Sequence, residues 1–99
     1  EYTMKTQELL KENRDQILRI SRTHGAIKLS LFGSAAREED NENSDIDFLV
    51  EFDEGRTLFD LIRLKQELEE LLGKSVDIVT EKAVHPLLKK QIKIEAIEL

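Results

Sequence analysis

The sequence predicts an α/β fold, a small mixed β-sheet of about three strands flanked by helices. Three observations lead to this fold. Two long segments, 4–22 and 57–72, carry apolar residues at helical spacing. Three short apolar runs, 27–32, 45–52 and 75–79, alternate in the manner of strands. The chain has no repeats, low-complexity segments or linkers, so we expect one domain over residues 1–99.

The composition is typical of a globular protein. Of 99 residues, 36% are charged and 39% are hydrophobic. There is no cysteine, which excludes disulfides and thiolate metal sites. No apolar run approaches the length of about 18 residues that a membrane span needs, and no signal-peptide pattern is present. We therefore expect a cytoplasmic protein with no membrane contact.

The first helix is expected from about Met4 to Arg22, and Gly25 is expected to cap its end. We interpret His24 as a solvated histidine at the helix end rather than a metal ligand. The first strand, Ile27–Phe32, follows and should place Ile27 on the same face as the other buried side chains of the run.

A Gly-Ser pair ends this strand. On their own, Gly33 and Ser34 would indicate an ordinary turn. Together with Arg37 and two nearby aspartates they predict a phosphate-binding turn. Glycine lets the backbone approach an anion, and the N–H groups at the start of a following helix bind it. Ser34 would add a hydroxyl and Arg37 a charged fork. The segment 38–43 reads as a solvated loop.

The second strand, 45–52, opens with two aspartates. Side chains alternate along a strand, so Asp45 and Asp47 should lie on one face, within roughly 7 Å of each other. Carboxylates this close repel each other unless a cation intervenes, and Mg²⁺ commonly shares such sites with substrate phosphates. The alternative is that both mark a solvent-facing strand end, but aspartate is unfavourable in strands. A phosphate turn beside paired carboxylates predicts metal-assisted phosphoryl or nucleotidyl transfer.

The next long helix is expected from Thr57, with Asp60 completing a capping box, to Leu72, where Gly73 stops it. We expect its whole apolar stripe to be core; its members are Leu58, Leu61, Ile62, Leu64, Leu68, Leu71 and Leu72.

Asp77 lies in the middle of the third strand, 75–79, where burial would be costly without a partner. A lone buried aspartate that accepts backbone hydrogen bonds is the alternative to a functional role. A last helix should begin at His85-Pro86 and pack its apolar residues on the sheet or on a partner. Its lysines, Lys89, Lys90 and Lys93, read as a solvated face rather than a triphosphate site.

The order of these motifs resembles the nucleotidyltransferase superfamily that includes DNA polymerase beta. The mark of that superfamily is Gly-Ser, a short spacer and Asp-x-Asp on the next strand. Here it reads Gly33-Ser34-Ala35-Ala36-Arg37, then Ser44-Asp45-Ile46-Asp47. The small size and the Gly-Ser-x-x-Arg form resemble the minimal nucleotidyltransferase (MNT) proteins, which are typically encoded beside a HEPN-domain partner as toxin–antitoxin pairs. The resemblance covers about Ile27 to Thr80.

The resemblance implies a polymerase beta-like nucleotidyltransferase fold and transfer of AMP from ATP to a hydroxyl, such as a tyrosine, on a HEPN ribonuclease toxin. Asp45 and Asp47 would hold two Mg²⁺ ions. Asp77 would be the third carboxylate, ligating the ion that activates the attacking hydroxyl and accepting its proton. Gly33 and Ser34 would hold the β- and γ-phosphates, and Arg37 the leaving pyrophosphate. The chain could work as a homo- or hetero-oligomer.

Two alternatives stay open. The first is a nucleotidyltransferase that acts on a small molecule, although such enzymes usually need a further domain for the acceptor. The second is a non-catalytic antitoxin that silences its toxin by contact alone; the presence of all three aspartates counts against it. The lack of a second domain to hold a template counts against a polymerase.

Nucleic acid is not expected as a direct substrate. The net charge is −6, and nine acidic residues fall from Glu38 to Glu54 with no lysine or arginine among them. The four phenylalanines lie in apolar patterns and should be core. Tyr2 is then the aromatic side chain left for base stacking.

Overall fold

The computed structural model describes residues 4–99, so Tyr2, the aromatic side chain expected to be free for base stacking, lies outside the described residues. In chain order the elements are α1 (Thr6–Glu12), α2 (Arg14–Thr23), β1 (Ala26–Phe32), β2 (Ile46–Phe52), α3 (Leu58–Leu72), β3 (Val76–Thr80), the 3₁₀ helix η1 (Glu81–Ala83), α4 (Pro86–Glu95) and β4 (Ile97–Glu98). The predicted α/β class, with a mixed sheet flanked by helices, is confirmed. No helix of the described part of the chain has the length and apolarity needed to cross a membrane.

The four strands form one sheet in the order β3-β2-β1-β4. β1 is antiparallel to β2 and to β4, whereas β2 and β3 are parallel. The sequence predicted three of these strands. It missed β4, which has two residues and pairs Ile97 with Leu31 of β1. A strand this short carries no alternating pattern that could be recognised.

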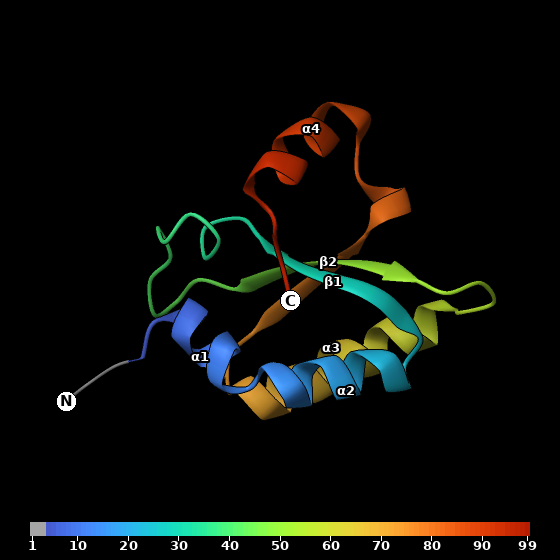
Figure 1. The fold of residues 1–99 in the computed structure, drawn as a ribbon, viewed down its shortest axis with the longest axis horizontal. Helices are drawn as coiled ribbons and strands as arrows, with labels where there is room; N and C mark the ends of the chain where they lie inside the picture. Colours follow the sequence, from blue (N-terminus) through green and yellow to red (C-terminus); the bar gives the residue numbers. More distant parts are fainter. Residues whose placement is uncertain (1–3) are drawn as a thin grey trace.

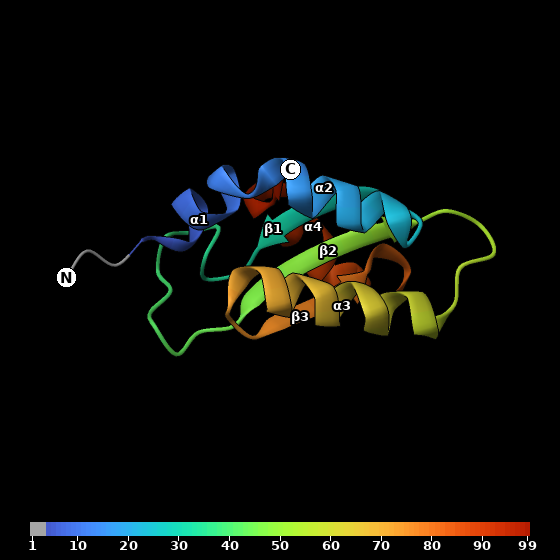
Figure 2. The same ribbon diagram turned by 90° about the horizontal axis from the view of Figure 1, so that it is seen from below.

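The helices are divided unequally between the two faces of the sheet. α1, α2 and α3 lie along one face, while α4 stands on the other side, away from the sheet (Figures 1 and 2). The core fills the space between the sheet and the first three helices; its largest fully buried side chains are Phe48, Leu10, Ile17, Leu31, Ile46, Leu64, Leu68 and Val50. α4 contributes no buried residue. The sheet face on the side of α4 is therefore the more accessible one.

The first helical segment is two helices and not one. α1 ends and α2 begins at Asn13, whose side-chain Nδ2 donates to the carbonyl oxygen of Leu9 at 2.8 Å. The same carbonyl accepts the backbone N–H of Asn13 at 3.2 Å. An asparagine amide that competes for a backbone carbonyl in this way favours a break over continued helix. The expected single helix over 4–22 is thus corrected.

α3 begins and ends as predicted. Thr57 and Asp60 form the capping box, and Gly73 adopts a left-handed conformation with φ of 67° at the end of the helix. Its apolar stripe is only partly core, because Leu58 and Ile62 are exposed.

Two further positions expected in the core are exposed. Phe59 precedes Leu68 by nine residues, which places it about 180° around the helix from that buried side chain, and it is 73% exposed. Ile27 is 64% exposed, because the register of β1 against β2 shifts between Ala26 and Lys28 and turns its side chain outward.

Candidate functional site

The site begins where β1 ends. Gly33 has φ of 76°, a conformation that residues with a side chain rarely adopt. A Cβ atom at this position would overlap the carboxylate of Asp47. The backbone of the Gly-Ser turn therefore lies directly against this aspartate of β2. The glycine therefore serves both the turn and the close approach of the turn to a carboxylate.

Residues 34–38 form a turn and not the expected start of an α-helix. The N–H groups of Ala36 and Arg37 donate to the carbonyl of Gly33, and Glu39 N–H donates to the carbonyl of Ser34 at 2.8 Å. The N–H groups of Ser34 and Ala35 take no part in these turn bonds. They are the backbone donors that an anion could use, although the turn lacks the dipole of a full helix.

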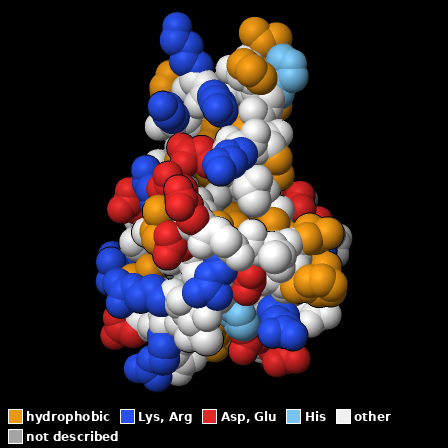
Figure 3. Space-filling view, turned by 90° about the vertical axis from the view of Figure 1, so that its right-hand side faces the viewer, with side chains coloured by type: hydrophobic (Ala, Val, Ile, Leu, Met, Phe, Trp, Pro, Cys, Tyr) orange, Lys and Arg blue, Asp and Glu red, His pale blue; other side chains and the backbone are white. Residues whose placement is uncertain are grey.

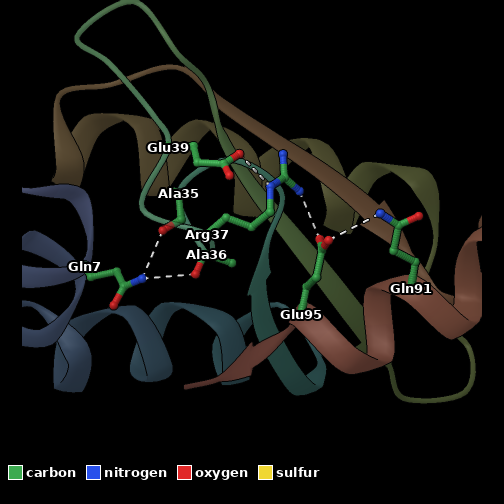
Figure 4. A network of polar contacts seen from close by, with 7 residues as sticks. All are labelled: Gln7, Ala35, Ala36, Arg37, Glu39, Gln91 and Glu95. Carbon is green, nitrogen blue, oxygen red and sulfur yellow. Dashed lines mark hydrogen bonds and ion pairs between the residues drawn. The ribbon is translucent and has the colours of Figure 1, made fainter.

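α1 holds the turn in place. Gln7 Nε2 donates to the carbonyl oxygens of Ala35 and Ala36, at 3.0 and 3.2 Å (Figure 4). Asp40 is fixed nearby, because the buried Thr6 hydroxyl donates to its Oδ2 at 2.5 Å. The loop 38–43 is thus not wholly a solvated connection as expected. No sequence pattern links Thr6 to Asp40, since the two are 34 residues apart.

Asp47 and Asp77 are neighbours across the parallel strands β2 and β3, and the charge of Asp45 also acts on Asp47. Asp47 is partly buried, and the strand register places it beside Phe32 of β1 and Asp77 of β3. Burial, followed by the charges of Asp77 and Asp45, raises the pKa of Asp47, while Arg37 acts in the opposite direction. Asp45 precedes β2 and is exposed. Asp47 thus lies against the Gly-Ser turn and beside Asp77, and the charges of Asp45 and Arg37 act on it, while the roles predicted for these residues stay predictions.

Asp77 is exposed, so the interpretation of a lone buried aspartate is wrong. Its strand neighbours Val76 and Ile78 are buried on the helix side, and alternation turns Asp77 to the other side, where Asp47 also lies. Alternation along the strand was enough to predict which face Asp77 lies on. It could not predict that β3 pairs in parallel with β2, which is what places Asp77 beside Asp47.

The carboxylates fit an open metal site rather than a closed one. Residues 4–99 contain no group of three or more His, Cys, Asp or Glu side chains placed to hold one metal ion. Mg²⁺, however, is commonly bound by one or two carboxylates together with substrate phosphates and water. Asp47, with Asp45 and the phosphate turn beside it, offers oxygen donors of that kind, and the raised pKa of Asp47 indicates negative charge that a cation would offset.

Arg37 is already engaged. Its Nε donates to Glu39 Oε2 and its Nη1 to Glu95 Oε2, both at 3.0 Å (Figure 4). Hydrogen bonds to Glu39 and then Glu95 raise the pKa of Arg37, so the guanidinium stays charged. Glu95 comes from α4 and had no signal in the sequence, because it lies 58 residues from Arg37.

The lysines of α4 lie elsewhere. Lys89 and Lys93 line a cleft of about 470 Å³ together with Glu51 near the end of β2. Figure 3 shows lysines gathered over α4 with acidic side chains beneath them. Glu51 is four residues from Asp47, or about 13 Å along a strand, so the cleft that Lys89 and Lys93 line lies away from Asp47. This placement agrees with their interpretation as a solvated face.

His24 is not the solvated histidine that was expected at the end of the helix. Its side chain is 14% exposed, and Nε2 contacts Glu67 of α3. The contact joins α2 to α3 on the far side of the sheet from the aspartates. It serves the packing of the two helices, and His24 has no place in the site.

Comparisons with known proteins show which proteins this chain is similar to. The family model of the nucleotidyltransferase domain matches residues 10–99. A Methanocaldococcus jannaschii protein named "putative protein adenylyltransferase" is 52% identical over 91% of this chain and 97% of its own length.

Two solved structures share the fold. The structure of a "putative minimal nucleotidyltransferase" has a TM-score of 0.85 and 50% identity, covering 93% of this chain and 94% of the other. A toxin–antitoxin crystal structure with AMP-PNP has a TM-score of 0.73 and 25% identity, covering 87% of this chain and 71% of the other.

Proposed function

This chain belongs to the nucleotidyltransferase domain family, and we propose that it transfers AMP from ATP to a hydroxyl of a HEPN-class partner protein, acting as its antitoxin. One observation carries the proposal: the backbone of Gly33 lies against the carboxylate of Asp47. A phosphate held by the Gly-Ser turn would therefore lie next to the carboxylates. Protein adenylyl transfer is the activity named for the 52% identical relative, and a toxin–antitoxin structure with an ATP analogue shares the fold.

The nucleotide would enter with its phosphates at the turn. The free N–H groups of Ser34 and Ala35 and the Ser34 hydroxyl would hold the β- and γ-phosphates. Arg37 would offset the charge of the pyrophosphate as it leaves. Asp45 and Asp47 would hold Mg²⁺, which supplies charge neutralisation at the phosphates and lowers the pKa of the attacking hydroxyl.

Asp77 completes the reaction as the proton acceptor. The acceptor oxygen forms a bond to the α-phosphorus, the bond from that phosphorus to the pyrophosphate breaks, and the hydroxyl proton passes to the Asp77 carboxylate. Asp77 is exposed, so an acceptor can reach it from outside the protein. A tyrosine hydroxyl, with a reference pKa of about 10, loses its proton more readily than an alkyl alcohol.

The acceptor is a protein rather than a nucleic acid in this proposal. The net charge of −6 repels a polyanion, and the exposed carboxylates Asp45 and Asp77 lie at the site itself. A docking protein can bring complementary charge and place a hydroxyl beside Asp77.

The test uses labelled ATP and Mg²⁺ with three acceptors in parallel: a cognate HEPN protein, tRNA and a DNA primer. We expect label on the HEPN protein, lost with Asp77→Asn and retained with the matched control Asp15→Asn on the exposed surface of α2. Label only on nucleic acid would overturn the choice of acceptor. Neutralisation of the partner without any label would favour a binding antitoxin, and label on a small molecule alone would favour that class of transferase.

A further inference from the structure

Arg37 lies between two carboxylates that differ in exposure. Glu39, from the turn, has a side chain that is 65% exposed, whereas that of Glu95, from α4, is 20% exposed. Water competes strongly for the first contact and less for the second. Glu95 is therefore the less solvent-screened of the two partners of the guanidinium.

The position of Glu95 is unfavourable for its own helix. It is the last residue of α4, where the negative end of the helix dipole opposes a carboxylate. The favourable contacts that hold it are the Arg37 guanidinium at 3.0 Å and Gln91 Nε2, which donates to Oε1 at 3.3 Å (Figure 4). The carboxylate is thus held toward Arg37 by polar contacts at the end of a helix that has no buried residue.

The cluster of Arg37, Glu39 and Glu95 carries a net charge of −1. A phosphate that approaches the guanidinium meets two carboxylates already bound to its Nε and Nη1 atoms. Arginine has five N–H donors and binds phosphate through pairs of them, so the two carboxylates leave some donors open but compete with a phosphate for the charge and the Nε and Nη1 donors of the guanidinium.

We propose that Glu95 competes with the nucleotide phosphates for Arg37, so that nucleotide binding releases the last turn of α4. The inference rests on the proposed function, which brings phosphates to Arg37. β4 follows Glu95 almost directly and stays paired to β1 through Ile97 and Leu31, so the release loosens one turn and does not detach the helix. Nucleotide occupancy is thereby coupled to the element that carries the exposed Leu87 and Ile94.

The first test measures the affinity of AMP-PNP with Mg²⁺ by calorimetry. Glu95→Gln should tighten binding about two- to five-fold, the range expected when one partly exposed ion pair no longer competes. The control Glu98→Gln removes an equal charge from an exposed pair with Lys28, whose atoms are 3.6 Å apart, and should leave affinity unchanged.

In an Arg37→Ala background, Glu95→Gln should lose most of its effect. An equal gain in both backgrounds would mean simple charge repulsion and would overturn competition for Arg37, as would weaker binding by Glu95→Gln alone.

The second test measures hydrogen exchange of the amides of residues 92–96. AMP-PNP should speed their exchange in the wild type, and in Glu95→Gln they should exchange fast without nucleotide. Slower exchange upon binding would overturn the inference and leave the proposed function standing. A wild type that neither binds AMP-PNP nor transfers label would overturn both.

Discussion

Asp47→Asn should make the metal-free protein more stable at neutral pH. The side chain is nearly isosteric, but the substitution removes a partly buried negative charge that faces two others. Most substitutions at partly buried positions destabilise a protein, so a gain in stability would be a specific signature of the repulsion.

The magnitude follows from the strand register. Asp77 is the parallel-strand neighbour of Asp47, and adjacent strands lie about 4.8 Å apart. Two unit charges about 5 Å apart repel by roughly 0.8 kcal/mol in the dielectric of water. Asp45, two residues along the chain, adds a smaller amount, and solvent screening reduces both because Asp45 and Asp77 are exposed. Burial of the charge, the largest cause of the raised pKa of Asp47, adds to this repulsion, so we expect a gain of about 1 kcal/mol, which corresponds to a rise in Tm of about 4–8 °C for a domain of this size.

The pH dependence has a defined sign. The pKa of Asp47 is raised in the folded state above its ordinary value of 3.8, so the ionised carboxylate destabilises the fold at pH values above the raised pKa. The stability difference between variant and wild type should shrink as the pH falls through that pKa and vanish below 3.8. Thermal melts at a series of pH values measure it, with Glu70→Gln on the exposed side of α3 as the control for loss of one negative charge.

Magnesium should reverse the order of thermal stability of the wild type and Asp47→Asn. Millimolar Mg²⁺ should raise the Tm of the wild type, because a cation that binds only the folded state stabilises it, and should leave Asp47→Asn unchanged. A variant that is less stable than the wild type at neutral pH, or one whose melting responds to Mg²⁺ as the wild type does, would refute the argument that repulsion at Asp47 is relieved by a cation.

Three further predictions concern the turn and α4. Gly33→Ala should lower stability by more than 1–2 kcal/mol in thermal melts, because it adds an overlap with Asp47 to the strain of its backbone angle; Gly55→Ala, with φ of 83° and open space around it, measures the strain alone and should cost less. Ser34→Ala should weaken AMP-PNP affinity in calorimetry while stability changes by no more than about 0.5 kcal/mol, and the opposite pattern would make Ser34 a structural residue. Leu87→Ser combined with Ile94→Ser should leave the Tm unchanged, since both side chains are over 80% exposed, but should weaken capture of a cognate HEPN protein in a pull-down; unchanged capture would place the interface elsewhere.

Local chemistry explains what could be predicted from the sequence. The capping residues Thr57 and Asp60 and the stop at Gly73 act within a few residues of chain, so both ends of α3 were predictable. Alternation along β2 likewise placed Asp47 on the face opposite the core. Each of these features needs only the geometry of one element.

What could not be predicted depends on contacts between distant segments. The Gln7 amide that holds the turn is 28 and 29 residues from its acceptors, and Glu95 is 58 residues from Arg37. The exposure of Phe59 depends on which side of α3 packs against the sheet. The apolar residues of α3 cover more than that side, so their pattern does not show which of them are buried. Sequence thus gave the chemical groups of the candidate site, while the state of Arg37, already bound by carboxylates, required the structure.

The uneven cover of the sheet favours the proposed transfer to another protein. The first three helices bury one face, whereas among the helices of residues 4–99 only α4 stands over the face that carries Asp47, and α4 has no buried residue (Figure 1). Such a face can bind phosphates at the turn, but it provides little enclosure for an acceptor, and exclusion of water strengthens the electrostatic contribution to catalysis. An acceptor that is itself a folded protein would cover this face and the exposed side chains of α4 as it delivers its hydroxyl. The accessible face that carries Asp47 is therefore consistent with the proposed protein acceptor, which would supply the missing enclosure.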